Sequence, residues 1–184
     1  MEGDKDGHEM STFGRHPRSM NTSVNHKPDT YPTVVPYISV RGAGALVDFL
    51  VEVFGAVERG RFPNEDGTLG HAEVDLGDSV IMAFDARPDW PPTPSLLTVW
   101  VEDCDATHAA ALAAGAVEVT ALTTSAFGFR GSRVRDPFGN IWWIQTQVEV
   151  VDGAEIGARL AQPQYAEAMR VAVETLDAEM RSRA

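Results

Sequence analysis

Three polar side chains that could carry out acid–base chemistry stand at alternate positions in the first half of the chain: His71, Glu73 and Asp75. In an extended strand these side chains share one face, and the apolar residues between them share the other. We expect the apolar face to contact a helix, so His71 and Glu73 should point toward a cleft or its rim. There Glu73 could orient His71 as a general base. The alternative, a strand whose outer face is simply polar, is the commoner origin of this pattern.

A glycine-flanked loop, Phe127–Gly131, suggests a second kind of chemistry, the binding of an anion. Glycines give such a loop conformational freedom, so we expect it to cover a cleft, where Arg130 could hold an anionic group of a ligand. The alternative is that the arginines of this region pair with acidic residues of the surface. We favour that pairing for Arg133 and Arg135.

Other chemistries find little support in the sequence. Cys104 lies between Asp103 and Asp105, and neighbouring carboxylates raise the pKa of a thiol and lower its reactivity. His108 belongs to an alanine-rich helical segment and is more consistent with packing than with catalysis. The sequence contains no P-loop, dinucleotide-binding fingerprint or Gly-x-Ser-x-Gly elbow.

An internal repeat indicates which elements must position these side chains. The tetrapeptide Gly55–Glu58 recurs as Gly115–Glu118, sixty positions later. In each copy a strand-like run and a helical run precede the tetrapeptide, and a strand-rich run follows it. Two copies are too few for a solenoid. The sequence therefore predicts two strand–helix–strand–strand–strand modules, a first module at 33–85 and a second module at 96–149, facing each other across a cleft.

Both ends of the chain lie outside the repeat. Residues 1–31 are polar, lack apolar periodicity and are predicted to be a disordered tail. Residues 151–184 are predicted to be a helical extension with one apolar stripe, formed by Met169, Val173, Leu176 and Met180. That stripe either packs on the domain or contacts a second subunit, and packing on the domain is the favoured interpretation.

Composition restricts the classes of partner. The 184 residues are 43% hydrophobic, enough for one domain with a core. The formal net charge of −12 argues against nucleic acid and acidic lipids, because both are bound through Lys and Arg. No apolar run approaches the roughly 20 residues of a membrane span, and the start of the chain lacks the order of a secretion signal. We therefore expect a cytoplasmic protein with no membrane partner.

Five motifs, in this order, resemble the vicinal oxygen chelate superfamily, and within it the PhnB-like branch of the glyoxalase/bleomycin resistance proteins. The motifs are Val35–Val40, Phe54–Ala56, Gly70–Glu73, Val101–Asp105 and Asp136–Trp143. The resemblance implies an α+β fold over residues 32–150, in which two tandem βαβββ modules form a glyoxalase/bleomycin-resistance/dioxygenase-type cup with helices outside, plus a C-terminal helix. It also implies a homodimer.

The resemblance also implies where a metal would bind. Metalloenzymes of the superfamily place His or Gln on the first strand of each module and Glu on the last. Matched residue by residue, these positions are Val35, Leu96, Trp143 and one residue within Val80–Phe84. Hydrocarbon and indole side chains are not ligands for a divalent ion. We therefore predict no metal and no cofactor.

The side chains that would line the cup follow from strand parity and the family register. Trp142 and Trp143 must point in opposite directions, and the family register places Trp143 in the cup. The expected ligand-binding residues are Tyr37, Ser39, Thr98, Trp100, Phe129, Arg130, Trp143 and Gln145. Such a set suits a flat, mostly apolar ligand. The alternative is that the aromatic rings fill the space themselves, as core residues.

The sequence thus predicts a metal-independent small-molecule-binding protein of the glyoxalase/bleomycin-resistance type, which sequesters or recognises an aromatic or apolar compound. An alternative is a glyoxalase-like lyase or isomerase that uses His71 and Glu73 or a rearranged divalent-metal site. A third possibility is an interaction module, in which the acidic surface and the C-terminal stripe bind a protein partner.

Overall fold

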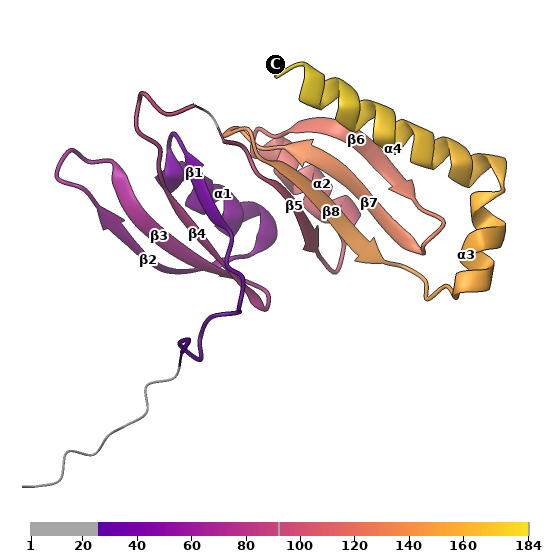
Figure 1. Cartoon of the computed structure of the whole chain (residues 1–184), viewed down its shortest axis with the longest axis horizontal. Helices are drawn as coiled ribbons and strands as arrows, with labels where there is room; N and C mark the ends of the chain where they lie inside the picture. Colours follow the sequence, from indigo (N-terminus) through magenta and orange to yellow (C-terminus); the bar gives the residue numbers. More distant parts are fainter. Residues whose placement is uncertain (1–25, 92, 184) are drawn as a thin grey trace, which may run out of the picture.

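The internal repeat folds as two units of the same topology in the computed structural model, which describes residues 26–91 and 93–183 (Figure 1). The first module contains β1 (Tyr37–Val40), α1 (Ala43–Phe54), β2 (Val57–Pro63), β3 (Leu69–Leu76) and β4 (Ser79–Asp85). The second contains β5 (Leu96–Trp100), α2 (Cys104–Ala113), β6 (Val117–Thr124), β7 (Phe129–Arg135) and β8 (Ile141–Gln147). Two helices follow, α3 (Gly153–Leu160) and α4 (Pro163–Arg181). The predicted disordered tail, residues 1–31, lies outside the described residues as far as residue 25.

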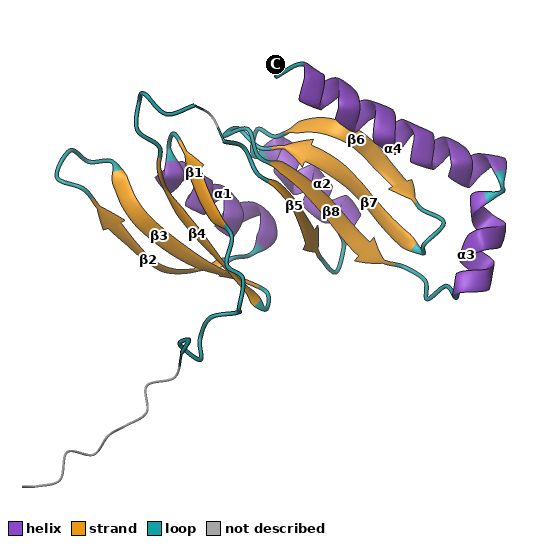
Figure 2. Ribbon diagram, viewed as in Figure 1, coloured by secondary structure: helices purple, strands orange, loops and turns teal. Residues whose placement is uncertain are grey.

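Each module forms a four-stranded mixed sheet, with the strand orders β1-β4-β3-β2 and β5-β8-β7-β6. The first and last strands of each module pair in parallel, and the other pairs are antiparallel. A helix covers one face of each sheet (Figure 2), and we call the opposite face the inner face. The predicted α+β fold of two βαβββ modules with a C-terminal helix is confirmed.

The repeated tetrapeptide marks the end of the helix in each module. Gly55 and Gly115 have φ angles of 67° and 91°, a left-handed conformation that glycine adopts without steric cost. The amide of Gly55 donates to the carbonyl of Val51 at 3.1 Å, which closes the last turn of α1. The alanines that follow, Ala56 and Ala116, are buried, and β2 and β6 begin directly after them. The repeat is therefore a helix stop followed by a strand start.

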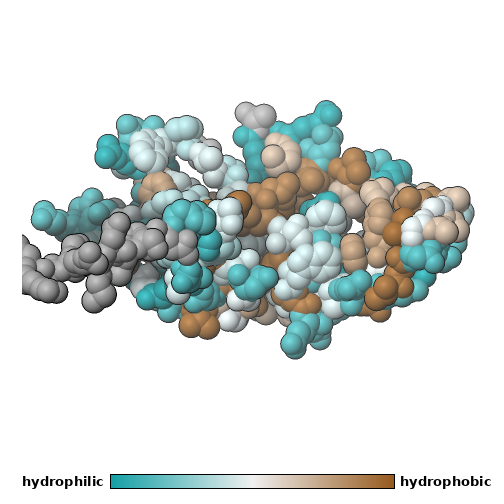
Figure 3. Space-filling model, turned by 60° about the horizontal axis from the view of Figure 1, so that its bottom comes forward, coloured by the Kyte–Doolittle hydropathy of each residue, from teal (hydrophilic) through white to brown (hydrophobic). Residues whose placement is uncertain are grey.

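The two modules meet through their helix-bearing faces. Helix α1 packs against α2, and the ring centroids of Phe54 and Trp142 lie 5.0 Å apart. One cluster of buried apolar residues includes both helices and both sheets. In the view of Figure 3, hydrophobic residues gather in the middle of the molecule and again toward the end that carries α3. The two sheets therefore do not face each other across one cleft, contrary to the prediction from the sequence. The inner face of each described sheet points away from this shared core.

A buried carboxylate holds the turn before β8. Asp136 is 1% exposed, and one of its oxygens accepts from the amides of Phe138 and Asn140 at 2.9 and 2.8 Å. The other oxygen accepts from the side-chain nitrogens of Asn140 and Trp142 at 2.8 and 2.9 Å. The side-chain oxygen of Asn140 in turn accepts from the amide of Ser95 at 3.0 Å. One carboxylate thereby ties the turn, the start of β5 and the largest buried side chain together.

Helix α4 returns along the second module beside β6 and covers part of its inner face (Figure 1). The hydroxyl groups of Thr120 and Thr175 lie 2.7 Å apart, and Arg135 forms an ion pair with Glu179 at 2.9 Å. Every residue of α4 is at least partly exposed, and Val173, in the predicted apolar stripe, keeps 60% of its surface exposed. The helix therefore covers the sheet but adds no fully buried side chain to the core. Across residues 26–91 and 93–183, no helix is both long and apolar enough to cross a membrane.

We predict that Asp136→Ala lowers the free energy of unfolding by about 3 kcal/mol or more, because several buried donors lose their acceptor and each costs about 1–3 kcal/mol. Trp142→Phe is the matched control, since it removes one of these hydrogen bonds and leaves the carboxylate in place. Its expected loss is smaller, roughly 1–2 kcal/mol. Urea denaturation of the full chain measures both. An Asp136→Ala protein as stable as the unmodified chain would show that the turn does not depend on the carboxylate.

Candidate functional site

The residues predicted for the site fall into separate groups on the two inner faces. Tyr37, His71 and Glu73 lie together on the inner face of the first module. Phe129, Trp143 and Gln145 line a cavity on the inner face of the second module. The remaining predicted residues, Ser39, Thr98, Trp100 and Arg130, lie outside that cavity. The two groups offer different chemistry.

A chain of hydrogen bonds crosses the inner face of the first module. The hydroxyl of Tyr37 lies 2.8 Å from Nδ1 of His71, and Nε2 of His71 lies 2.8 Å from Glu73. An ionised carboxylate can only accept, so Nε2 donates to Glu73, and in the neutral imidazole Nδ1 then accepts from the Tyr37 hydroxyl. Tyr37 is 52% exposed, so the chain ends at solvent. This order, carboxylate to imidazole to hydroxyl, is one that can relay a proton.

Glu73 is kept ionised by a residue that the sequence placed in the tail. The Tyr31 hydroxyl donates to Glu73 at 2.6 Å. This bond, followed by the one from His71, lowers the pKa of the Glu73 carboxyl, against the opposing effect of burial. The same contact raises the pKa of the Tyr31 hydroxyl. Arg59 lies 3.8 Å from Glu73 and pairs more closely with Asp75. No local sequence pattern predicts this role of Tyr31, because Tyr31 and Glu73 are 42 positions apart in the sequence.

The cavity on the second module lies between its sheet and α4. Its volume is about 220 Å³, and all its lining residues come from the second module and α4. The aromatic lining residues are Phe127, Phe129, Trp143 and Tyr165. Trp143 remains 37% exposed, whereas Trp142 is 1% exposed in the helix layer, which is the alternation expected from strand parity. Gln145 is 6% exposed, so its amide is the most buried polar group that β8 contributes to this face.

The three arginines of β7 have different environments. Arg130 makes a bidentate contact with Asp105 at 2.6 and 2.7 Å, which lowers the pKa of the Asp105 carboxyl. Arg135 pairs with Glu179 as expected. Arg133, for which we expected a surface ion pair, is instead 7% exposed and lines the cavity. The signal that could have found it is parity, because Arg133 shares a strand face with Phe129.

The glycines of the Phe127–Gly131 loop allow close packing against β8, and Gly128 also has a left-handed φ angle of 78°. A Cβ atom on Gly128 would lie 2.3 Å from the carbonyl oxygen of Glu149, and one on Gly131 would lie 2.4 Å from that of Ile144. Side chains at these positions would push the backbones apart. The loop is therefore held against the end of β8, where it forms one wall of the cavity.

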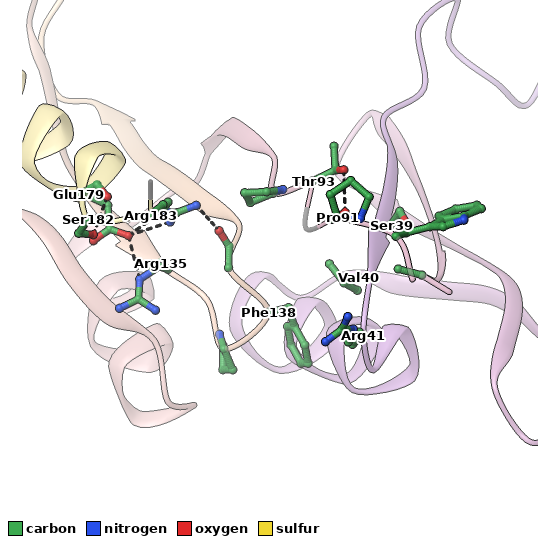
Figure 4. A pocket seen from close by; sticks show the side chains of 15 residues that line it. Ser39, Val40, Arg41, Pro91, Thr93, Arg135, Phe138, Glu179, Ser182 and Arg183 are labelled. Carbon is green, nitrogen blue, oxygen red and sulfur yellow. Dashed lines mark hydrogen bonds and ion pairs between the residues drawn. The ribbon is translucent and has the colours of Figure 1, made fainter. Parts of the chain in front are cut away.

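The other predicted ligand residues face two clefts between the modules. Ser39 lines a cleft of about 650 Å³. Figure 4 shows Arg135, Glu179 and Arg183 on one side of it and Ser39 and Arg41 on the other. Thr98 and Trp100 line a further cleft of about 760 Å³ beside the edge strand β5. Both clefts are open. In the first cleft, Arg135 and Arg183 both pair with Glu179, at 2.9 and 2.8 Å.

The positions at which the family's metalloenzymes hold their metal do not fit one in this chain. Trp143 pairs with Thr98 in the same register in which Met82 pairs with Tyr37, so Met82 is the fourth position. Together with Val35 and Leu96, these side chains provide neither carboxylate oxygen nor imidazole nitrogen. Among residues 26–91 and 93–183, no three His, Cys, Asp or Glu side chains gather as metal ligands would.

Cys104 and His108 have structural environments. Burial, more than the neighbouring Asp105, raises the pKa of the Cys104 thiol. His108 is 6% exposed, and its ring nitrogens lie 2.8 Å from Ser132 and 3.1 Å from Glu118. Both side chains hold α2 on its sheet.

Comparison with known proteins identifies the architecture. The family model of the Glyoxalase/Bleomycin resistance protein/Dioxygenase superfamily matches residues 32–144, so α3 and α4 lie beyond the match. An uncharacterized protein of Mycobacterium bovis is 36% identical over 141 residues, which cover 71% of this chain and 93% of the relative. The crystal structure of TioX from Micromonospora sp. ML1 is 30% identical, with a TM-score of 0.53 over 62% of this chain and 97% of its own. Protein PA1353 from Pseudomonas aeruginosa, 17% identical, has a TM-score of 0.54 over 62% of this chain and 96% of its own and shows the fold alone.

We predict that Glu73 contributes to the pH dependence of stability on the acid side. A carboxyl whose pKa is lower in the folded chain than in the unfolded chain stabilises the fold above the unfolded value, and this contribution is lost as the pH falls through the folded value. Between pH 7 and pH 3, the unmodified chain should therefore lose more stability than Glu73→Gln. Tyr31→Phe should shift the loss toward higher pH, because it removes the largest cause of the lowered pKa. Thermal unfolding across this range measures both, and superimposable profiles would contradict the assignment.

Proposed function

Because the chain belongs to the Glyoxalase/Bleomycin resistance protein/Dioxygenase superfamily, we propose that it is a metal-independent protein that binds an aromatic or apolar small molecule and thereby sequesters or recognises it. The superfamily fold does not by itself determine a function. The observation that supports the proposal is the cavity on the inner face of the second module, which aromatic rings line and α4 covers.

The size of the cavity restricts the ligand. A volume of about 220 Å³ is below the roughly 300–1,000 Å³ of pockets for drug-sized ligands. It exceeds the roughly 150 Å³ that accommodates a benzene ring. A ligand with one ring and a short substituent fits within this volume. Trp143 and Phe129 offer ring faces and edges for such a ligand, and Gln145 offers an amide.

Metal independence is supported by the donor chemistry of the family's ligand positions. Trp143 stands where the superfamily's metalloenzymes have a carboxylate, and the equivalent position of the first module is Met82. In this chain the same strand position thus provides a ring for contact and no charge for coordination.

The finer assignments belong to the same proposal. The order of the sequence motifs supports a place in the PhnB-like branch of the superfamily. We further propose that the protein is cytoplasmic and that it forms a homodimer. The exposed apolar side chains Tyr37, Phe62 and Trp100 support the homodimer.

We predict that neutral monocyclic aromatic compounds, for example phenol and benzyl alcohol, bind to the chain and that Trp143→Leu weakens this binding about fivefold to tenfold, as expected for loss of an aromatic contact. Trp90→Leu is the matched control, because Trp90 lies outside the cavity. Calorimetric titration in the presence of EDTA measures the affinity and tests metal independence together. Absence of binding across the panel, or equal weakening by both substitutions, would refute the site.

A second candidate function is a lyase or isomerase based on the first module. The supporting observation is the hydrogen-bonded order Glu73–His71–Tyr37, which ends at an exposed hydroxyl. Such a relay could remove and return a proton next to a carbonyl group.

For this candidate function we predict that the chain exchanges the hydrogen next to the carbonyl of an α-hydroxy carbonyl compound for deuterium in heavy water. His71→Gln should abolish the exchange without lowering the melting temperature, and Tyr37→Phe should reduce it. Proton NMR follows the exchange directly. A chain that exchanges none of a panel of such compounds would leave this network with a structural role.

A further inference from the structure

Arg133 is the one charged side chain among the described residues that line the cavity of the second module. It is 7% exposed, although arginine is almost never buried without a partner. Its neighbours on β7, Arg130 and Arg135, each have a carboxylate at 2.6 and 2.9 Å. Within the described ranges, no carboxylate lies within ion-pair distance of Arg133.

The contacts of Arg133 satisfy only part of its guanidinium group. One terminal nitrogen donates to the carbonyl of Ala172 in α4 and, at 3.4 Å, to the hydroxyl of Thr120. The guanidinium carbon lies 4.2 Å from the ring centroid of Trp143. Nε is buried and has no hydrogen-bond partner among the described residues. All of these contacts are with neutral groups, so the positive charge has no counter-charge.

An uncompensated buried charge is costly, because water no longer stabilises it. Burial lowers the pKa of the Arg133 guanidinium, yet an arginine side chain remains protonated in proteins. The chain has 27 acidic residues against 15 Lys and Arg, so acids abound, and none of the described ones is placed here. The cavity is therefore electrostatically incomplete in the absence of a ligand.

We propose that the ligand of this cavity is a monocyclic aromatic acid whose carboxylate pairs with Arg133. This inference rests on the proposed function and adds the charge of the ligand to it. The ligand carboxylate supplies the counter-charge that the guanidinium of Arg133 lacks. The ring lies among Trp143, Phe129 and Phe127. Because Arg133 also bonds to Ala172, the charged site and the roof formed by α4 are coupled.

The test compares acids with their neutral amides of nearly the same shape: benzoate with benzamide, and phenylacetate with phenylacetamide. Calorimetric titration of the full chain should show each acid binding at least tenfold more tightly than its amide. Arg133→Met should remove this preference and keep the binding of the amides. Arg61→Gln, an ion-paired arginine of the first module, is the matched control and should leave the preference unchanged.

The stability of the variant separates a binding role from a structural one. If Arg133 serves an anion, Arg133→Met should fold with an unchanged or higher melting temperature without ligand, since an apolar side chain can replace an uncompensated buried charge without loss. Benzoate should raise the melting temperature of the unmodified chain more than benzamide does.

Three outcomes would overturn the inference. Equal affinities for acid and amide in the unmodified chain would show that the charge of Arg133 is not used, and Trp143-dependent binding of neutral rings would then still stand as the proposed function. A preference for acids that persists in Arg133→Met would place the anion elsewhere. If neither neutral rings nor acids bind in a Trp143-dependent way, the proposed function fails together with this inference.

Discussion

The carboxylate of Asp136 fixes the geometry on which both modules depend. It accepts from two amides of its own turn, from Asn140 and from the indole nitrogen of Trp142, and it is withdrawn from solvent. Trp142 then contacts Phe54 of α1, so the same carboxylate positions the contact between the two modules. Because adjacent residues of a strand point to opposite faces, anchoring Trp142 in the helix layer also directs Trp143 to the inner face. A buried hydrogen-bond network, one turn away, thus sets the orientation of the candidate binding surface.

The two modules have the same topology, but their inner faces have diverged in charge. Glu73 pairs with Met82 across β3 and β4, and Arg133 occupies the corresponding place opposite Trp143 across β7 and β8. In the first module the acid is satisfied by Tyr31 and His71. In the second module the base contacts neutral groups alone among the described residues. At the same position in the sheet, the first module therefore has a carboxylate with hydrogen-bond partners, and the second module has an arginine without a counter-charge.

Helix α4 converts an open sheet face into a partly covered cavity. It lies beyond the residues that match the superfamily, and it touches the sheet through Thr175, Glu179 and the carbonyl of Ala172. These hydrogen bonds and the ion pair are polar, and no residue of the helix is fully buried. A helix with no fully buried residue is expected to be among the less stable parts of a structure, from which ligand-binding segments that open are drawn. The enclosure and the uncompensated charge together favour recognition of a small anionic molecule over unselective apolar binding.

The sequence by itself determined the features that depend on neighbours along the chain. The repeat predicted two modules, because a glycine that ends a helix and the strand that follows are local events. Strand parity predicted that Trp142 and Trp143 point to opposite faces of the sheet. Residue-by-residue matching to the superfamily showed that its metal-ligand positions carry no ligand side chains in this sequence. Only the tertiary structure decided that Arg130 has a carboxylate while Arg133 does not, that Tyr31 leaves the predicted tail to bind Glu73, and that α4 covers the second module. Each of these depends on contacts between residues distant in sequence, and side-chain charge alone does not reveal which partner the fold brings near.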